Sequence, residues 1–191
     1  MKKLFLTILA AALTAVCANA QLYVGAGYSF SPTETKVGKI SERFTRNGFY
    51  AQAGYNINFG KYFGLVPGVE YEVVTKNDDG VKKPEQYLNI PIKVTCGFSL
   101  GNVVELGVFA APEYSLGLTS KAKADDKSVD LYGEDSFFKR GDFRVGLGVY
   151  CDLIEKIRLN LNYNIGIVNR SKLDNTTIRR NGVQLGIAYL F

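Results

Sequence analysis

The chain has 191 residues, of which 47% are hydrophobic and 21% are charged, with a formal net charge of +5. This mild positive charge does not indicate a nucleic-acid-binding protein, because acidic and basic residues are mixed wherever they cluster. No segment after residue 20 approaches the roughly 20 consecutive apolar residues that a membrane-spanning helix needs, which excludes a helical membrane protein.

Residues 1–20 have the three parts of a secretory signal peptide. Lys2 and Lys3 form its charged start, an apolar core follows over 4–16, and Ala18-Asn19-Ala20 is a small-x-small cleavage site. We expect cleavage after Ala20, which leaves residues 21–191 as a single domain.

After the signal, apolar and polar residues alternate with a period of two in segments bounded by turn residues. Strands are expected near 21–30, 48–58, 62–74, 86–98, 103–118, 138–152, 156–168 and 181–191. Long connections are expected near 31–47, 75–85, 119–137 and 169–180, and short turns near 59–61, 100–102 and 154–155. Alternating long and short connections are typical of an up-and-down barrel in an outer membrane, with both termini on the short-turn, periplasmic side.

One face of every predicted strand is apolar and uncharged. In the last strand this face consists of Val183, Leu185, Ile187, Tyr189 and Phe191. Aromatic residues on this face gather near both strand ends, as at membrane interfaces. We therefore predict an all-β fold, an eight-stranded antiparallel up-and-down transmembrane β-barrel. A soluble lipocalin-like carrier would need the reverse orientation, and the charges on the other face and the terminal Phe191 argue against it.

The other face carries the charges and most of the glycines, and we expect it to line the lumen. Toward the long-connection end lie Glu70, Glu72, Glu113, Asp142, Arg140, Arg144 and Arg180, and toward the short-turn end lie Lys93, Glu105, Asp152 and Arg158. Because both signs occur at both levels and buried charges need partners, we predict ion pairs that fill the narrow lumen. A narrow diffusion channel is the main alternative, and a catalytic carboxylate pair is a weaker one.

Three prolines, Pro67, Pro91 and Pro112, fall inside predicted strands. Each removes a ladder hydrogen bond, and a closed barrel has no free edge to place it on. We therefore expect a local bulge at each proline.

The residue types argue against an enzyme. The chain has no histidine, so a serine lacks its usual general base and zinc lacks its commonest nitrogen ligand. We expect a non-enzymatic protein with no cofactor or metal. Cys96 and Cys151 fall on the lipid-facing side of strands that are not neighbours, which argues against a disulfide.

The first long connection is basic, with Lys36, Lys39, Arg43 and Arg46. A solvated loop is the simplest interpretation. Phosphate groups of lipopolysaccharide, held by charge-assisted hydrogen bonds, are an alternative ligand, and a specific protein or host receptor is another.

The segment Tyr87-Leu88-Asn89-Ile90-Pro91 is similar to the Tyr-Leu-x-Ile-Pro segment of the outer-membrane β-barrel family common in Bacteroidetes, often named porin-family or PorT-like proteins. The resemblance extends loosely over the mature chain, including Val24-Gly25-Ala26-Gly27 and the Tyr-Leu-Phe end. It implies an integral outer-membrane barrel similar in size to outer-membrane proteins A and X, which we expect to be monomeric. PorT itself serves a secretion machine, so an accessory role in a secretion assembly is a further alternative.

The resemblance also implies that the barrel-assembly machinery recognises the final strand through Tyr189 and Phe191. Replacing Phe191 with a charged residue should therefore lower the amount of assembled barrel, measured as heat-modifiable protein in outer membranes. Unchanged insertion would contradict this assignment.

Overall fold

A computed structural model describes residues 20–37, 40–78, 81–101, 103–124, 127–130, 139–172 and 175–191. The predicted signal peptide lies outside these residues, apart from Ala20. The strands within them are β1 (Ala20–Val37), β2 (Ile40–Phe59), β3 (Phe63–Asp78), β4 (Val81–Leu100), β5 (Val104–Ala124), β6 (Lys127–Asp130), β7 (Gly141–Leu153), β8 (Ile157–Gly166), β9 (Thr176–Arg180) and β10 (Gly182–Leu190). Within the described part of the chain, no helix is long and apolar enough to cross a membrane.

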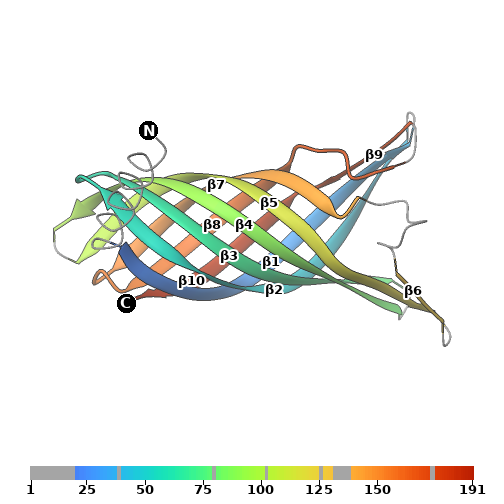
Figure 1. Cartoon of the computed structure of the whole chain (residues 1–191), viewed down its shortest axis with the longest axis horizontal. Coiled ribbons are helices and arrows are strands. Elements are labelled where there is room, and N and C mark those ends of the chain that lie inside the picture. Colours follow the sequence, from blue (N-terminus) through green and yellow to red (C-terminus); the bar gives the residue numbers. More distant parts are fainter. Residues whose placement is uncertain are drawn as a thin grey trace, which may run out of the picture.

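The strands close into a single antiparallel barrel (Figure 1). Their order is β10-β8-β7-β5-β4-β3-β2-β1, and β10 pairs with β1 to close the ring. β9 and β10 are two parts of one strand, because both pair with β1 in the same register on either side of Asn181. The backbone N–H of Asn181 donates to the Pro32 carbonyl at 3.1 Å. The predicted eight-stranded antiparallel barrel is therefore confirmed.

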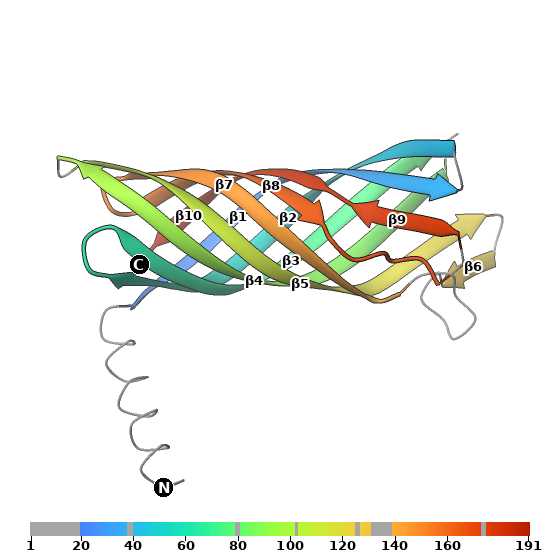
Figure 2. The same ribbon diagram turned by 90° about the horizontal axis from the view of Figure 1, so that it is seen from above.

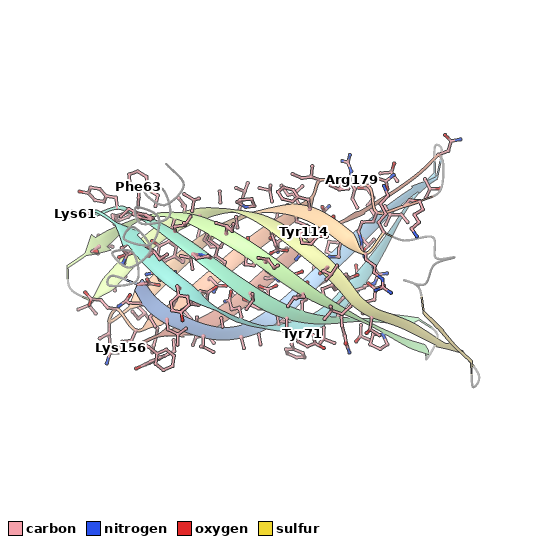
Figure 3. The ribbon with its side chains drawn as sticks, in the orientation of Figure 1. Lys61, Phe63, Tyr71, Tyr114, Lys156 and Arg179 are labelled. Carbon is pink, nitrogen blue, oxygen red and sulfur yellow. The ribbon has the colours of Figure 1, made fainter. Side chains whose placement is uncertain are left out.

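Side chains alternate between the outer wall and the lumen, as the period of two predicts. In β8 and β10 exposed and buried residues alternate without interruption. Ile57 is a buried exception on the predicted outer face. Phe63 stands on the outer wall near the short-turn end, and Tyr71 and Tyr114 stand nearer the other end (Figure 3). The outer wall is thus an apolar band with aromatic residues toward both ends, which suits a bilayer.

Strands extend into two of the predicted long loops. β1 continues to Val37 and pairs with β2 from Ile40 onward, and β3 continues to Asp78 and pairs with β4 from Val81 onward, so that each pair forms a hairpin. The ladder pairs Val37 with Ile40 and Asp78 with Val81, so each hairpin extends well beyond the barrel (Figure 2). The apolar alternation ends in these segments because neither face is continuously apolar there, although the backbone pairing persists.

The other two long connections also contain strands. In 119–137, β5 continues to Ala124 and pairs with β6. In 169–180, β9 adds a third strand beside the β1–β2 hairpin. The three short turns are where the sequence places them. Gly60 and Gly101 have φ of 68° and 69°, and Ile154 and Glu155, in the turn between β7 and β8, have φ of 54° and 56°. Positive φ at both central residues suits the twist of a tight hairpin.

The expectation of a bulge at each proline is wrong. Pro67 pairs with Ile92 in the same β3–β4 register that pairs Glu70 with Asn89, and Pro112 pairs with Val145 in an unshifted β5–β7 ladder. A one-residue register shift would turn the apolar face of a long strand into the lumen. Losing a few ladder pairs beside a proline costs less free energy than such a shift, so the register is kept. The register shift in the β4–β5 ladder lies between Gln86 and Tyr87.

The band of outward side chains should tolerate no charge at its middle. Val149 is exposed on the outer wall between its register partners Val108 and Leu161. Val149→Arg should lower the free energy of unfolding by about 2–4 kcal/mol, measured by urea titration in lipid vesicles. The control is Leu153→Arg at the turn end of β7, where the cost should be about 0–1 kcal/mol. An equal loss of unfolding free energy at both positions would contradict the placement of Val149 near the middle of the bilayer and Leu153 near its surface.

Candidate functional site: the polar lumen

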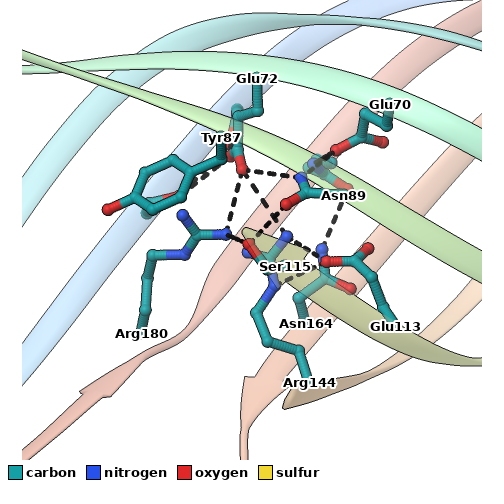
Figure 4. A network of polar contacts seen from close by, with 12 residues as sticks. Glu70, Glu72, Tyr87, Asn89, Glu113, Ser115, Arg144, Asn164 and Arg180 are labelled. Carbon is teal, nitrogen blue, oxygen red and sulfur yellow. Dashed lines mark hydrogen bonds and ion pairs between the residues drawn. The ribbon is translucent and has the colours of Figure 1, made fainter. Parts of the chain in front are cut away.

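The lumen centres on the carboxylate of Glu72, which projects inward from β3 (Figure 4). Arg180 on β9 and Arg144 on β7 bring Nη2 to 3.3 Å and 3.6 Å from its Oε2. Asn89 on β4 donates to the same oxygen at 3.1 Å, and the hydroxyl of Ser29 on β1 donates to Oε1. Five strands from opposite walls therefore meet at one carboxylate.

A second carboxylate shares one of these arginines. Glu113 Oε1 accepts a hydrogen bond from Arg144 Nε at 2.7 Å and also contacts Arg144 Nη2. Arg180 Nη2 donates to the Ser115 hydroxyl at 3.0 Å, and that hydroxyl donates to the Asn89 side-chain oxygen at 2.6 Å. Two arginines thus balance two glutamates, which is the pairing that buried charges require.

The third glutamate at this level, Glu70, is held by amides. Its Oε1 accepts from Asn89 Nδ2 at 2.9 Å and from Gln184 Nε2 at 2.7 Å. Gln184 Oε1 in turn accepts from Asn162 and Asn164 on β8. The amides extend the network from β4 across to β10.

An outer layer of charged and aromatic groups lies beside this cluster. The Arg180 guanidinium lies 3.6 Å from the centre of the Tyr87 ring, and the Arg170 guanidinium lies 5.3 Å from it. Such stacking stabilises a desolvated guanidinium, which matters because Arg180 Nε and Nη1 have no hydrogen-bond acceptor. Glu85 pairs with Arg46 at 3.2 Å, and Asp142 lies 4.0 Å from Arg170 Nε.

An inner layer lies toward the short-turn end. Arg158 binds Asp152 through two hydrogen bonds of 2.7 Å and stacks over Tyr150 at 4.4 Å. The Tyr150 hydroxyl donates to Glu105 at 2.8 Å. Lys93 donates to Gln52 Oε1 at 2.9 Å and lies 5.4 Å from the centre of the Phe109 ring.

The predicted lumen residues differ in where the structure places them. Glu70, Glu72, Glu113, Arg144 and Arg180 meet in one cluster. Lys93 contacts Gln52 and the Tyr23 and Phe109 rings, with no carboxylate among its hydrogen-bond partners. The expectation for Arg140 is wrong, because it is exposed just before β7 begins.

The basic first loop is also not a loop in the structure. Arg46 lies in β2, largely buried, and pairs with Glu85. Lys36 and Arg43 lie in β1 and β2, their side chains outside the described residues together with Lys39.

Several members of the network were not anticipated from the sequence. Asn89, Ser115 and Gln184 lie on the inward face of their strands and carry no charge. Only their position in the alternation along the strand could have indicated that they belong to the network. Arg170 lies in the irregular segment between β8 and β9, where no periodicity assigns a direction. Its side-chain N–H donates to the Tyr87 hydroxyl at 3.3 Å.

Within the described ranges, no group of three or more histidine, cysteine, aspartate or glutamate residues could hold a metal ion. Cys96 and Cys151 are free thiols, on β4 and β7 with β5 between them.

The sequence of residues 4–191 matches the family model described as outer membrane protein beta-barrel domain. The chain belongs to this family. It is therefore an integral protein of a bacterial outer membrane. No curated protein matches the chain. The PorT-like subgroup stays a prediction.

Solved structures share the fold at low sequence identity. Neisserial surface protein A is 14% identical, with a TM-score of 0.56 over 90% of this chain and 99% of that one. The attachment invasion locus protein Ail of Yersinia pestis, in complex with the heparin analogue sucrose octasulfate, is 15% identical, with a TM-score of 0.53 over 91% of this chain and 99% of that one.

Removing one partner of the Arg144–Glu113 pair should destabilise the barrel. Arg144→Met should lower the free energy of unfolding by about 3–5 kcal/mol, because it leaves Glu113 buried without its cation. Adding Glu113→Gln should recover part of this loss, since the charge in need of a partner is removed. Arg179→Met, at an exposed position, is the control and should stay within about 0.5 kcal/mol. Chemical unfolding of the refolded barrel measures these variants together with Glu113→Gln alone, and a double variant that loses the sum of both single effects would contradict the coupling.

Proposed function

We propose that this chain is a non-enzymatic outer-membrane barrel whose lumen is structural and whose protruding hairpins carry its interactions. The observation that supports this most is the burial of the central cluster. Glu72, Asn89, Ser115, Arg144 and Arg180 each have 0% exposed surface. Groups that line a water-filled pore keep accessible surface, whereas these groups contact each other. An eight-stranded barrel is just wide enough for side chains to fill.

The hairpins offer surface at the opposite end from the C-terminus (Figure 2). Within the described residues, β2 pairs with β3 no further out than Asn47–Thr75, while β1–β2 and β3–β4 continue as separate hairpins. The hairpins therefore diverge into two arms, one with β9 and one with β5 and β6 (Figure 1). Beyond Asn47 and Thr75 the facing edges of β2 and β3 are no longer joined by the β2–β3 ladder, and strand edges outside a ladder favour contact with a partner.

The partners that fit this end are anionic groups of the outer leaflet, including the phosphates of lipopolysaccharide. Lys139, Lys172 and Arg179 are exposed near the base of the β9 arm. Their charge would complement phosphate through charge-assisted hydrogen bonds. The Yersinia pestis protein Ail in complex with a heparin analogue shows that one barrel of similar fold binds a polyanion.

The remaining expectations belong to the same proposal. The termini and short turns face the periplasm, the hairpins face outward, and the barrel works as a monomer. The assembly machinery recognises the strand that ends in Tyr189 and Phe191, whose rings are edge-to-face at 4.9 Å. An accessory role in a secretion assembly, as in PorT, is an alternative.

The rival function is a narrow diffusion channel. It would use the same lumen charges as a selectivity filter, and it predicts conductance that rises when Arg144 or Glu113 loses its partner. The absence of histidine, together with carboxylates that bind arginines and amides, supports a non-enzymatic role over a catalytic one.

Single-channel recording of the refolded mature protein in planar bilayers separates the two functions. We expect no discrete openings from protein whose folding is shown by heat-modifiable gel migration, because the side chains of the central cluster are at most 3% exposed. A general porin reconstituted in the same way is the positive control. Steady unitary openings from the wild-type barrel would overturn the proposal.

A further inference from the structure

The short-turn end of the barrel contains a cavity of about 660 Å³. Its lining includes Gln21, Asn56, Ser99, Glu105, Asp152 and Glu155. Three of the lining residues are acidic, and no lysine or arginine is among them. This turn-end cavity is therefore open space next to a surplus of carboxylates, unlike the filled centre of the lumen.

The carboxylates of the turn-end cavity are not equally neutralised. Asp152 is bound by Arg158 through two hydrogen bonds. Glu105 accepts hydrogen bonds from the Tyr150 hydroxyl at 2.8 Å and the Ser99 hydroxyl at 3.5 Å, and none of its hydrogen-bond donors is a cation. Glu155 lies exposed in the turn between β7 and β8. The cavity thus carries net negative charge available to a cationic group.

Asn56 adds a buried acceptor to the same cavity. Its side chain is 3% exposed, and its Nδ2 donates to Asn58 Oδ1 at 3.4 Å. Its Oδ1 has no hydrogen-bond donor. A buried polar atom without a hydrogen-bond partner is costly. Because Asn56 lines the cavity, a donor bound there could supply the missing hydrogen bond. A primary ammonium group, with positive charge and three N–H donors, is complementary to this set of acceptors.

We propose that the turn-end cavity is a site for a primary ammonium group, and that the α-ammonium of Gln21 fills it once the signal peptide is removed. Gln21 lines the cavity and is the register partner of Asn56 in the β1–β2 ladder. The new terminus therefore lies on the same rung of the ladder as the residue with the orphaned oxygen, and both residues border the cavity. The proposal rests on cleavage after Ala20 and is independent of whether the lumen conducts.

The seated ammonium would fasten the start of β1 to β2. Cleavage removes the Ala20–Ile57 pair from the ladder, and the ammonium replaces it with a charge-assisted contact. Barrel closure depends on β1, which pairs with β2 on one edge and with β10 on the other. Removal of the signal would then complete the barrel at its turn end.

The test uses protein exported with its own signal and purified from outer membranes. Mass spectrometry first establishes that the chain begins at Gln21 with a free amine. The rate of α-amine acylation is then compared in three forms that all show heat-modifiable migration: wild type, Asn56→Leu and Asn56→Asp. The leucine removes the acceptor at nearly constant size, and the aspartate keeps it and adds charge. We expect acylation in wild type to be slower than in Asn56→Leu by about tenfold or more, and slower still in Asn56→Asp.

Equal rates in all three forms, a chain that begins elsewhere, or an N-terminus without a free amine would overturn the proposal. A second arm adds putrescine during thermal unfolding. If the Gln21 amine is acylated as fast as that of a free peptide, while putrescine stabilises wild type and not Asn56→Leu, a soluble amine fills the site and the assignment to Gln21 is wrong.

Discussion

A polypeptide that crosses lipid must satisfy every backbone N–H and C=O within itself, because the hydrocarbon offers no hydrogen-bond partner. In this chain that condition is met where the last strand pairs with the first. The β10–β1 ladder runs from Tyr23–Leu190 to Phe30–Val183, and β9 continues it in the same register past Asn181. Only when this ring is closed does the apolar face of every strand point outward and the polar face point into a lumen.

Closure in turn determines the chemistry of the lumen. Strands distant in sequence are brought within side-chain reach, so Arg180 near the C-terminus meets Glu72 and the Tyr87 ring on the facing wall. Pairing of this kind stabilises little compared with an apolar core, but breaking one partner is costly. The network therefore holds its own side chains in defined positions across the lumen, and its burial supports a structural role.

The two ends of the barrel contrast with this centre. At one end the strands continue as polar hairpins that diverge into two arms, leaving backbone edges and basic side chains exposed. At the other end short turns surround an acidic cavity with an unpartnered amide oxygen. Between the two ends lies the buried network of Glu72, Arg144 and Arg180.

The amino-acid sequence by itself determined the number of transmembrane strands, the face that meets lipid and the short turns, because alternation of side chains with a period of two is a local property of a strand. It did not indicate that β1–β4 extend into the predicted loops, since neither face of those segments is continuously apolar. It also could not assign partners: Arg46 and Glu85, or Arg170 and Tyr87, meet only when the sheet closes. Which strands face each other across the lumen depends on closure and strand tilt, and only the tertiary structure sets these.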